Sequence, residues 1–261
     1  MHTTEYLARS APARRPRGLI RLCWAETLLF LREPAAMFFS LVFPMAMLFF
    51  LGVAYGGTDE DGVRFIDRYV PQVVVVVAMN IGLLGVAINI AECRARGILR
   101  RYKLAPVPFW WFWLSQVYVG VLMFLFSAAL LLAVVAAVYG LVLAAPLAFV
   151  AVTLVGLATN FAMGVLLGGL RAPVRTVQIT GTAFFFVMFF GSGAAIPRSA
   201  FPGWLQAVTT VNPMTPVVDA STSAYLGQPM SPHALGLGLV LLFAVAVVAV
   251  AGKVSSLDGD R

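Results

Sequence analysis

Long apolar segments constrain this chain more than any other feature of its sequence. Six of them approach or exceed the roughly 20 apolar residues that a transmembrane helix needs, and they occupy residues 36–55, 70–91, 109–139, 147–170, 177–195 and 234–251. Transmembrane barrels instead show short segments of alternating polarity. Because 61% of the residues are hydrophobic and only 11% are charged, we predict an all-α integral membrane protein with six transmembrane helices. Residues 1–261 are expected to form a single transmembrane domain.

Basic residues between these segments predict the orientation of the chain. If the N-terminus is cytosolic, only Arg64, Arg68 and Arg198 lie outside. The other fifteen of the 18 Lys and Arg residues then fall in the cytosolic segments 1–33, 92–106, 171–175 and 252–261. The positive-inside rule favours this arrangement over its inverse, so both termini are predicted to face the cytosol. The same bias accounts for the net charge of +7, and no nucleic-acid partner is predicted.

Two segments outside the predicted spans are partly apolar. In residues 17–33, apolar side chains recur at helical spacing, which predicts an amphipathic helix at the membrane interface that ends before the following proline. Residues 196–233 form a long exterior segment with few charges, in which Trp204 is typical of an interface anchor. Pro202 and Pro213 are each expected to open a short helix there, because proline is favoured in the first helical turn.

Sequence motifs for energy coupling are missing from the chain. It has no phosphate-binding P-loop motif, no residue cluster typical of a metal site or a catalytic triad, and no acidic residue in the middle of a predicted span. A proton- or sodium-driven mechanism therefore has little support. If the protein moves a substrate uphill, we expect ATP and Mg²⁺ to bind to a partner chain, with no cofactor on this one.

A basic segment, residues 92–108, separates the second and third spans and reads ECRARGILRRYKLAPVP. It cannot lie in lipid, because a charged side chain at the centre of a membrane helix costs about 2.5 to 3.5 kcal/mol. On a short helix, Ile98, Leu99 and Tyr102 would form a small apolar face surrounded by basic side chains. Such a face suits docking to a cytosolic partner. A basic loop that contacts lipid headgroups is the alternative.

This segment resembles the cytosolic loop of type-2 ABC exporter permeases of the daunorubicin-resistance kind. The residues that fall on the family pattern are Glu92, Arg94, Gly97, Leu99, Arg101, Pro106 and Pro108. Ala95 stands where the family often has an acid. Residues 32–34 with 41–44 are similar to the family's start of the first span. The exterior segment also carries a motif similar to one of the family, formed by Pro197, Pro202, Trp204, Asn212, Pro213 and Asp219.

The resemblance implies a permease subunit of an ATP-driven exporter in the bacterial inner membrane. Two such subunits, identical or paralogous, would assemble with two P-loop ATPase subunits that bind ATP and Mg²⁺. Residues 92–106 would act as the coupling helix, and residues 196–233 would re-enter the outer leaflet of the membrane. The residues expected to couple to the ATPase are Glu92, Arg94, Gly97, Leu99, Arg100, Arg101 and Pro106.

The resemblance also places the transport path between subunits, along the first, second and fifth spans. The candidate path residues are Asn80, Phe185, Met188 and Phe189. Aromatic and Met side chains suit a small amphiphilic substrate, and packing between helices or against lipid is the alternative for each of them. The predicted function is export of a drug-like or hydrophobic substrate, as in antibiotic efflux. Export of lipid or polysaccharide, a secondary carrier and a non-transporting scaffold are the alternatives.

Overall fold

The computed structural model describes residues 42–55, 62–99, 110–195 and 201–256, together with residues 24, 27, 28 and 38. Its regular elements are helices, and five of those helices are long and apolar enough to cross a membrane. A shorter apolar helix, α3 (Phe43–Tyr55), represents the first predicted span. The predicted all-α membrane fold is therefore confirmed. The predicted interface helix, residues 17–33, falls almost wholly outside the described residues.

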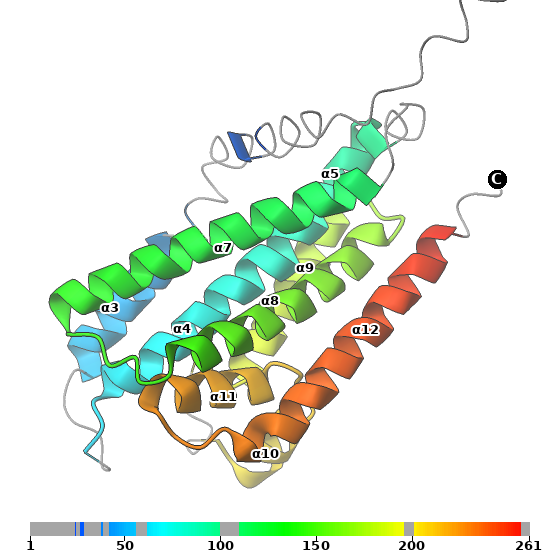
Figure 1. Cartoon of the computed structure of the whole chain (residues 1–261). Helices are drawn as coiled ribbons and strands as arrows, with labels where there is room; N and C mark the ends of the chain where they lie inside the picture. Colours follow the sequence, from blue (N-terminus) through cyan, green and yellow to red (C-terminus); the bar gives the residue numbers. More distant parts are fainter. Residues whose placement is uncertain are drawn as a thin grey trace, which may run out of the picture.

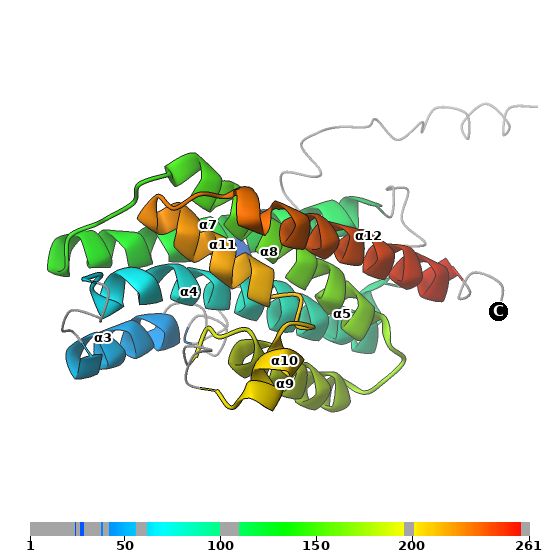
Figure 2. The same cartoon turned by 90° about the horizontal axis from the view of Figure 1, so that it is seen from below.

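One continuous helix forms the centre of the bundle (Figure 1). It consists of α4 (Phe65–Met79), a π-helical turn η2 (Asn80–Gly85) and α5 (Val86–Ala95). Its valine-rich middle has no polar face, and a helix that is apolar all round is expected to be buried. Accordingly, α3, α7, α8, α9 and α11 all contact it, and Figure 2 shows α4 between α3 and α11.

The remaining spans are α7 (Trp110–Val138), α8 (Pro146–Gly169), α9 (Val174–Gly191) and α12 (Ala234–Ser256). Figure 1 shows α7 and α12 on opposite sides of the bundle. Only 17% of the most apolar 18-residue stretch of α12 is buried, against 72% of the corresponding stretch of the central helix. In a membrane protein, such an exposed apolar helix faces lipid or another subunit.

Glycines bring α8 and the central helix into backbone contact. A Cβ atom on Gly164 would lie 2.3 Å from the carbonyl oxygen of Gly82, and one on Gly168 would lie 2.8 Å from that of Ala87. Gly164 and Gly168 are four residues apart, the small-residue spacing that permits close helix pairs in membranes. The contact includes η2, a π-helical turn of a kind that is rare and often occurs at functional sites.

Arg64 joins two helix ends at the outer end of the bundle, as the charge bias orients it. Its Nε and Nη2 atoms donate to the Asp67 carboxylate at 2.8 and 3.0 Å, and Nη1 donates to the Tyr139 carbonyl at 2.7 Å. The hydrogen bond to Asp67 raises the pKa of Arg64 above its usual value. The helix begins at Phe65 rather than at residue 70, the predicted boundary, and the paired Asp67 lies in its first turn.

The exterior segment contains two short helices, α10 (Gly203–Thr209) and α11 (Thr215–Leu226). Pro202 immediately precedes α10, as expected. Pro213 does not open a helix; Pro216 occupies the first turn of α11 instead. Helix α11 packs against α4 and α8. It ends at Gly227, whose φ of 74° is left-handed and favours glycine. A single turn, η4 (Ser231–His233), leads into α12.

We predict that Gly164→Ala destabilises the chain, because the added methyl group has no space beside the Gly82 carbonyl. Overpacking of this kind costs about 1–3 kcal/mol, so the apparent melting temperature in detergent should fall by several degrees, as measured by size-exclusion chromatography after heating. The matched control is Gly169→Ala, where an added Cβ meets nothing within 4 Å. Equal melting temperatures for the two variants would contradict the backbone contact.

Candidate coupling segment and outer pocket

The central helix continues into the predicted coupling segment. Helix α5 ends at Ala95, and Gly97 follows with a φ of 69°, a left-handed conformation that side chains other than glycine rarely adopt. The Glu92 carboxylate accepts a hydrogen bond from Arg96 at 2.9 Å, one helical turn along. The chain therefore turns at Gly97 because glycine permits it, and the segment is joined directly to the buried helix.

Arg94 points into the protomer. Its Nη1 atom donates to the Gly168 carbonyl at 2.7 Å, and its Nη2 atom donates to the Ala172 carbonyl at 2.9 Å. Gly168 is in the last turn of α8, and Ala172 lies in the turn between α8 and α9. The last four carbonyl groups of a helix lack partners within it, and a cation at that end is favoured by the helix dipole.

The structure describes only part of the predicted coupling set. Ile98 and Leu99, which were expected to form an apolar docking face, are half-buried and pack against the core of this protomer. The three remaining predicted residues lie outside the described ranges: Arg100, Arg101 and Pro106. Contact of this segment with an ATPase stays a prediction.

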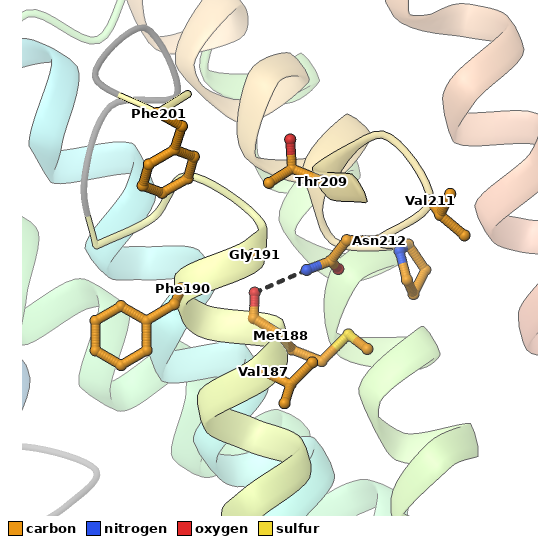
Figure 3. Close-up of a pocket in the computed structure, with 9 residues that line it drawn as sticks. Val187, Met188, Phe190, Gly191, Phe201, Thr209, Val211 and Asn212 are labelled. Atoms are coloured by element: carbon orange, nitrogen blue, oxygen red, sulfur yellow. Dashed lines mark hydrogen bonds between the residues drawn. The ribbon is translucent and has the colours of Figure 1, made fainter. Parts of the chain in front are cut away.

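At the other end of the bundle, Asn212 ties the exterior segment to α9. Its Nδ2 atom donates to the Met188 carbonyl at 3.0 Å, shown as the dashed line in Figure 3. Its Oδ1 atom accepts from the backbone N–H of Met214 at 2.9 Å. Thr215 adds a hydrogen bond from Oγ1 to the Thr209 carbonyl at 2.7 Å. The Asn-Pro-Met-Thr sequence thus holds the start of α11 and caps the end of α9.

A pocket of about 600 Å³ lies between the end of α9 and the segment around α10 (Figure 3). Its lining is mostly apolar: Val187, Met188, Phe190, Gly191, Phe201, Thr209, Val211, Asn212 and Pro213. Both polar side chains in this lining are hydrogen-bonded within the protein, since Thr209 donates to the Gln206 carbonyl. The described lining of the pocket therefore offers apolar contact and no charged side chain.

The predicted path residues on α9 face two ways. Phe185 and Phe189 are each 5% exposed and pack in the core with residues of α4, η2 and α11. Met188 is also buried there, and it lines the pocket as well. Val187 and Phe190, on the opposite face, are exposed. In this conformation Phe185 and Phe189 pack between helices, and their part in a transport path stays a prediction.

Asn80 and the exterior motif are spread over several elements. Asn80 is half-buried in η2, whereas Asn89 donates to the Gln116 Oε1 atom of α7 at 2.8 Å. Trp204 is 71% exposed on α10, which suits an interface anchor. Asp219 is half-buried in α11. Pro197 lies outside the described residues.

Sequence reasoning missed Asn160 on α8. This side chain is fully buried against Gly82, and its Nδ2 atom donates to the Gly156 carbonyl at 2.8 Å and contacts the Met214 sulfur at 3.1 Å. A single amide within an apolar run was the available signal, since such residues in membranes commonly bond between helices. Asn160 thereby links α8 to the start of α11.

A family model described as ABC-2 type transporter matches residues 17–226, which is most of the chain. No curated protein matches the sequence. The chain belongs to the ABC-2 type transporter family and is a multi-pass membrane permease subunit of an ABC transporter. Membership in this family implies association with an ATP-binding subunit.

We predict that Asn212→Asp loosens the exterior segment. The substitution keeps the acceptor for Met214 but replaces the donor with a carboxylate oxygen that faces the Met188 carbonyl. An unsatisfied buried group costs about 1–3 kcal/mol, so amide hydrogen exchange in α10 and the following turn should quicken. The control is Thr210→Ala, which removes only an exposed bond within the same segment. Unchanged exchange in Asn212→Asp would refute the tie to α9.

Proposed function

We propose that this permease exports a small hydrophobic or amphiphilic compound, such as a drug or a natural product, across the inner membrane of a bacterium. Two permease subunits would form the transport path, and two P-loop ATPase subunits on the cytosolic side would bind ATP and Mg²⁺. The family supplies the permease assignment. The outer pocket is the observation that supports the kind of substrate.

The chemistry of the pocket favours apolar compounds. Its size lies within the 300–1,000 Å³ range of ligand sites, and apolar surface gains free energy by leaving water for such a lining. A polysaccharide would lose hydration of many hydroxyl groups here without gaining partners, which is costly. The hydrocarbon part of a drug or a lipid suits the pocket, whereas a sugar polymer does not.

The continuous central helix supports an ATP-driven mechanism. The proposed docking segment, residues 92–106, begins in the last turn of α5, and the same helix extends to Phe65 at the far end of the bundle. Closure of the ATPase dimer would displace residues 92–106 and tilt this helix together with the helices packed on it. Tilting of packed helices is an established way to open and close a binding site.

Filling the outer pocket should reduce export. Val187→Trp places a large ring in the pocket from an exposed position on α9. Because pocket shape changes of a few methylene groups alter discrimination by 10-fold or more, we expect ATP-dependent transport of a fluorescent bisbenzimide dye into inverted vesicles to fall by about tenfold. Val245→Trp is the control, since Val245 is similarly exposed on α12 and does not line the pocket. Equal dye transport in both variants would show that the pocket is not part of the transport path.

Reversing charge in the docking segment should uncouple the transporter. We expect Leu99→Glu combined with Arg101→Glu to abolish transport and ATPase co-purification while membrane insertion continues. Because Leu99 is half-buried, Arg101→Glu alone is measured in parallel and should weaken co-purification without altering the melting temperature. The control is Lys253→Glu, which reverses a charge on the same side of the membrane, the predicted cytosolic side. Normal transport by the double variant would contradict the proposal that residues 92–106 dock on the ATPase.

A further inference from the structure

We infer that Arg94 is a positioning residue that joins the docking segment to α8 and α9, so that the cytosolic ends of three helices move as one body. The inference rests on the proposed function, in which residues 92–106 receive motion from the ATPase. It differs from the expectation that Arg94 contacts the ATPase, because the structure turns its guanidinium into the protomer.

One guanidinium group spans the end of α8 and the turn that leads to α9. Its two acceptors, the carbonyl groups of Gly168 and Ala172, lie on either side of the end of α8, at 2.7 and 2.9 Å from Nη1 and Nη2. The planar fork of arginine presents two donors in a fixed geometry, whereas a lysine ammonium is a single point charge. Arg94 is therefore suited to hold both carbonyl groups at once.

These carbonyl groups have few other donors available. Gly168 is one of the last four residues of α8, so its carbonyl has no donor within the helix. Ala172 lies in the turn before α9, and the first backbone hydrogen bond of that helix, from Val177, ends at the Pro173 carbonyl and not at that of Ala172. Removal of Arg94 would leave both oxygens without the charge-assisted donors that the structure provides, in a turn that is partly buried.

The backbones adjoining Arg94 are already packed tightly. A Cβ on Gly168 would lie 2.8 Å from the Ala87 carbonyl and 2.9 Å from the Ile90 Cβ. Val177 of α9 packs with Ala87 and Ala91 of α5. Helix α5 thus contacts α8 and α9 within two turns of Arg94. The arginine adds two hydrogen bonds at the end of α5 that leads into the docking segment.

Helix α9 connects the turn held by Arg94 to the outer pocket. Helix α9 begins next to the Arg94 acceptors and ends at Gly191, and Val187, Met188 and Phe190 in its last turns line the outer pocket. A displacement of the docking segment that reaches Arg94 therefore reaches both ends of α9. This connection gives the ATPase a mechanical route to the pocket in addition to the central helix.

The test compares Arg94→Gln, Arg94→Lys and the control Arg175→Gln in the complete transporter reconstituted in proteoliposomes. Arg175 is exposed on the first turn of α9. Its substitution removes the same charge near the same turn and leaves the two hydrogen bonds of Arg94 in place. We expect Arg94→Gln to retain ATPase co-purification and basal hydrolysis but to lower bisbenzimide dye transported per ATP by about tenfold, within the usual range of coupling between sites. Arg94→Lys should retain an intermediate ratio, and Arg175→Gln should match the unmodified protein.

A crosslink separates a mechanical role from a structural one. In a background with Cys23→Ser and Cys93→Ala, the pair Arg94→Cys and Ala172→Cys is joined by a short bifunctional thiol reagent. The crosslink should restore transport per ATP above that of the uncrosslinked pair. Recovery of the melting temperature alone would overturn the inference, as would loss of ATPase co-purification in Arg94→Gln or an unchanged ratio in that variant. Failure of the proposed function itself would appear in the unmodified transporter, as dye transport that does not depend on ATP.

Discussion

Unpaired carbonyl groups at helix ends are the constraint on which this structure depends, because every long helix that enters an apolar environment carries them. Side chains far away in sequence supply the donors at three ends. Arg64 reaches the carbonyl at the end of α7, and Arg94 reaches those at the end of α8. Asn212 adds a second donor to the Met188 carbonyl near the end of α9, which also accepts from the Ser192 N–H. The polar side chains of an otherwise apolar bundle are placed where backbone groups need them, and they set which helix ends meet.

Sequence reasoning predicted the spans well and their polar ends less well. Apolar runs identify membrane helices because lipid excludes charge, but Asp67 and Arg94 lie inside the central helix. Asp67 is paired with Arg64, three residues earlier in the chain, whereas the two acceptors of Arg94 lie at the distant end of α8, which a local pattern does not reveal. The faces of α9 were also beyond prediction. Phe185 is buried and Phe186 is exposed, and a helix that is apolar all round carries no periodic signal for its orientation.

The candidate site was predictable in position more than in contacts. The resemblance singled out Asn212 and Arg94, yet their acceptors lie 24 and 74 or more residues away in the chain. Asn160 was missed, although its amide links α8 to Met214. Long-range pairs of this kind depend on the tertiary packing of helices, which neither hydropathy nor spacing encodes. The outer pocket is likewise formed by two segments that meet only in the folded chain.

The glycine contact limits how the central helix can move. Because the carbonyl of Gly82 faces Gly164 and that of Ala87 faces Gly168 with no room for a methyl group, sliding α8 along the central helix by one residue would drive side chains into backbone atoms. Packed interfaces of this kind change by discrete steps and do not deform continuously. In the proposed mechanism, motion that begins at the docking segment would therefore carry the central helix and α8 together. Helix α9 is linked to them through Arg94 at one end and lines the pocket at the other, so its displacement would alter the pocket.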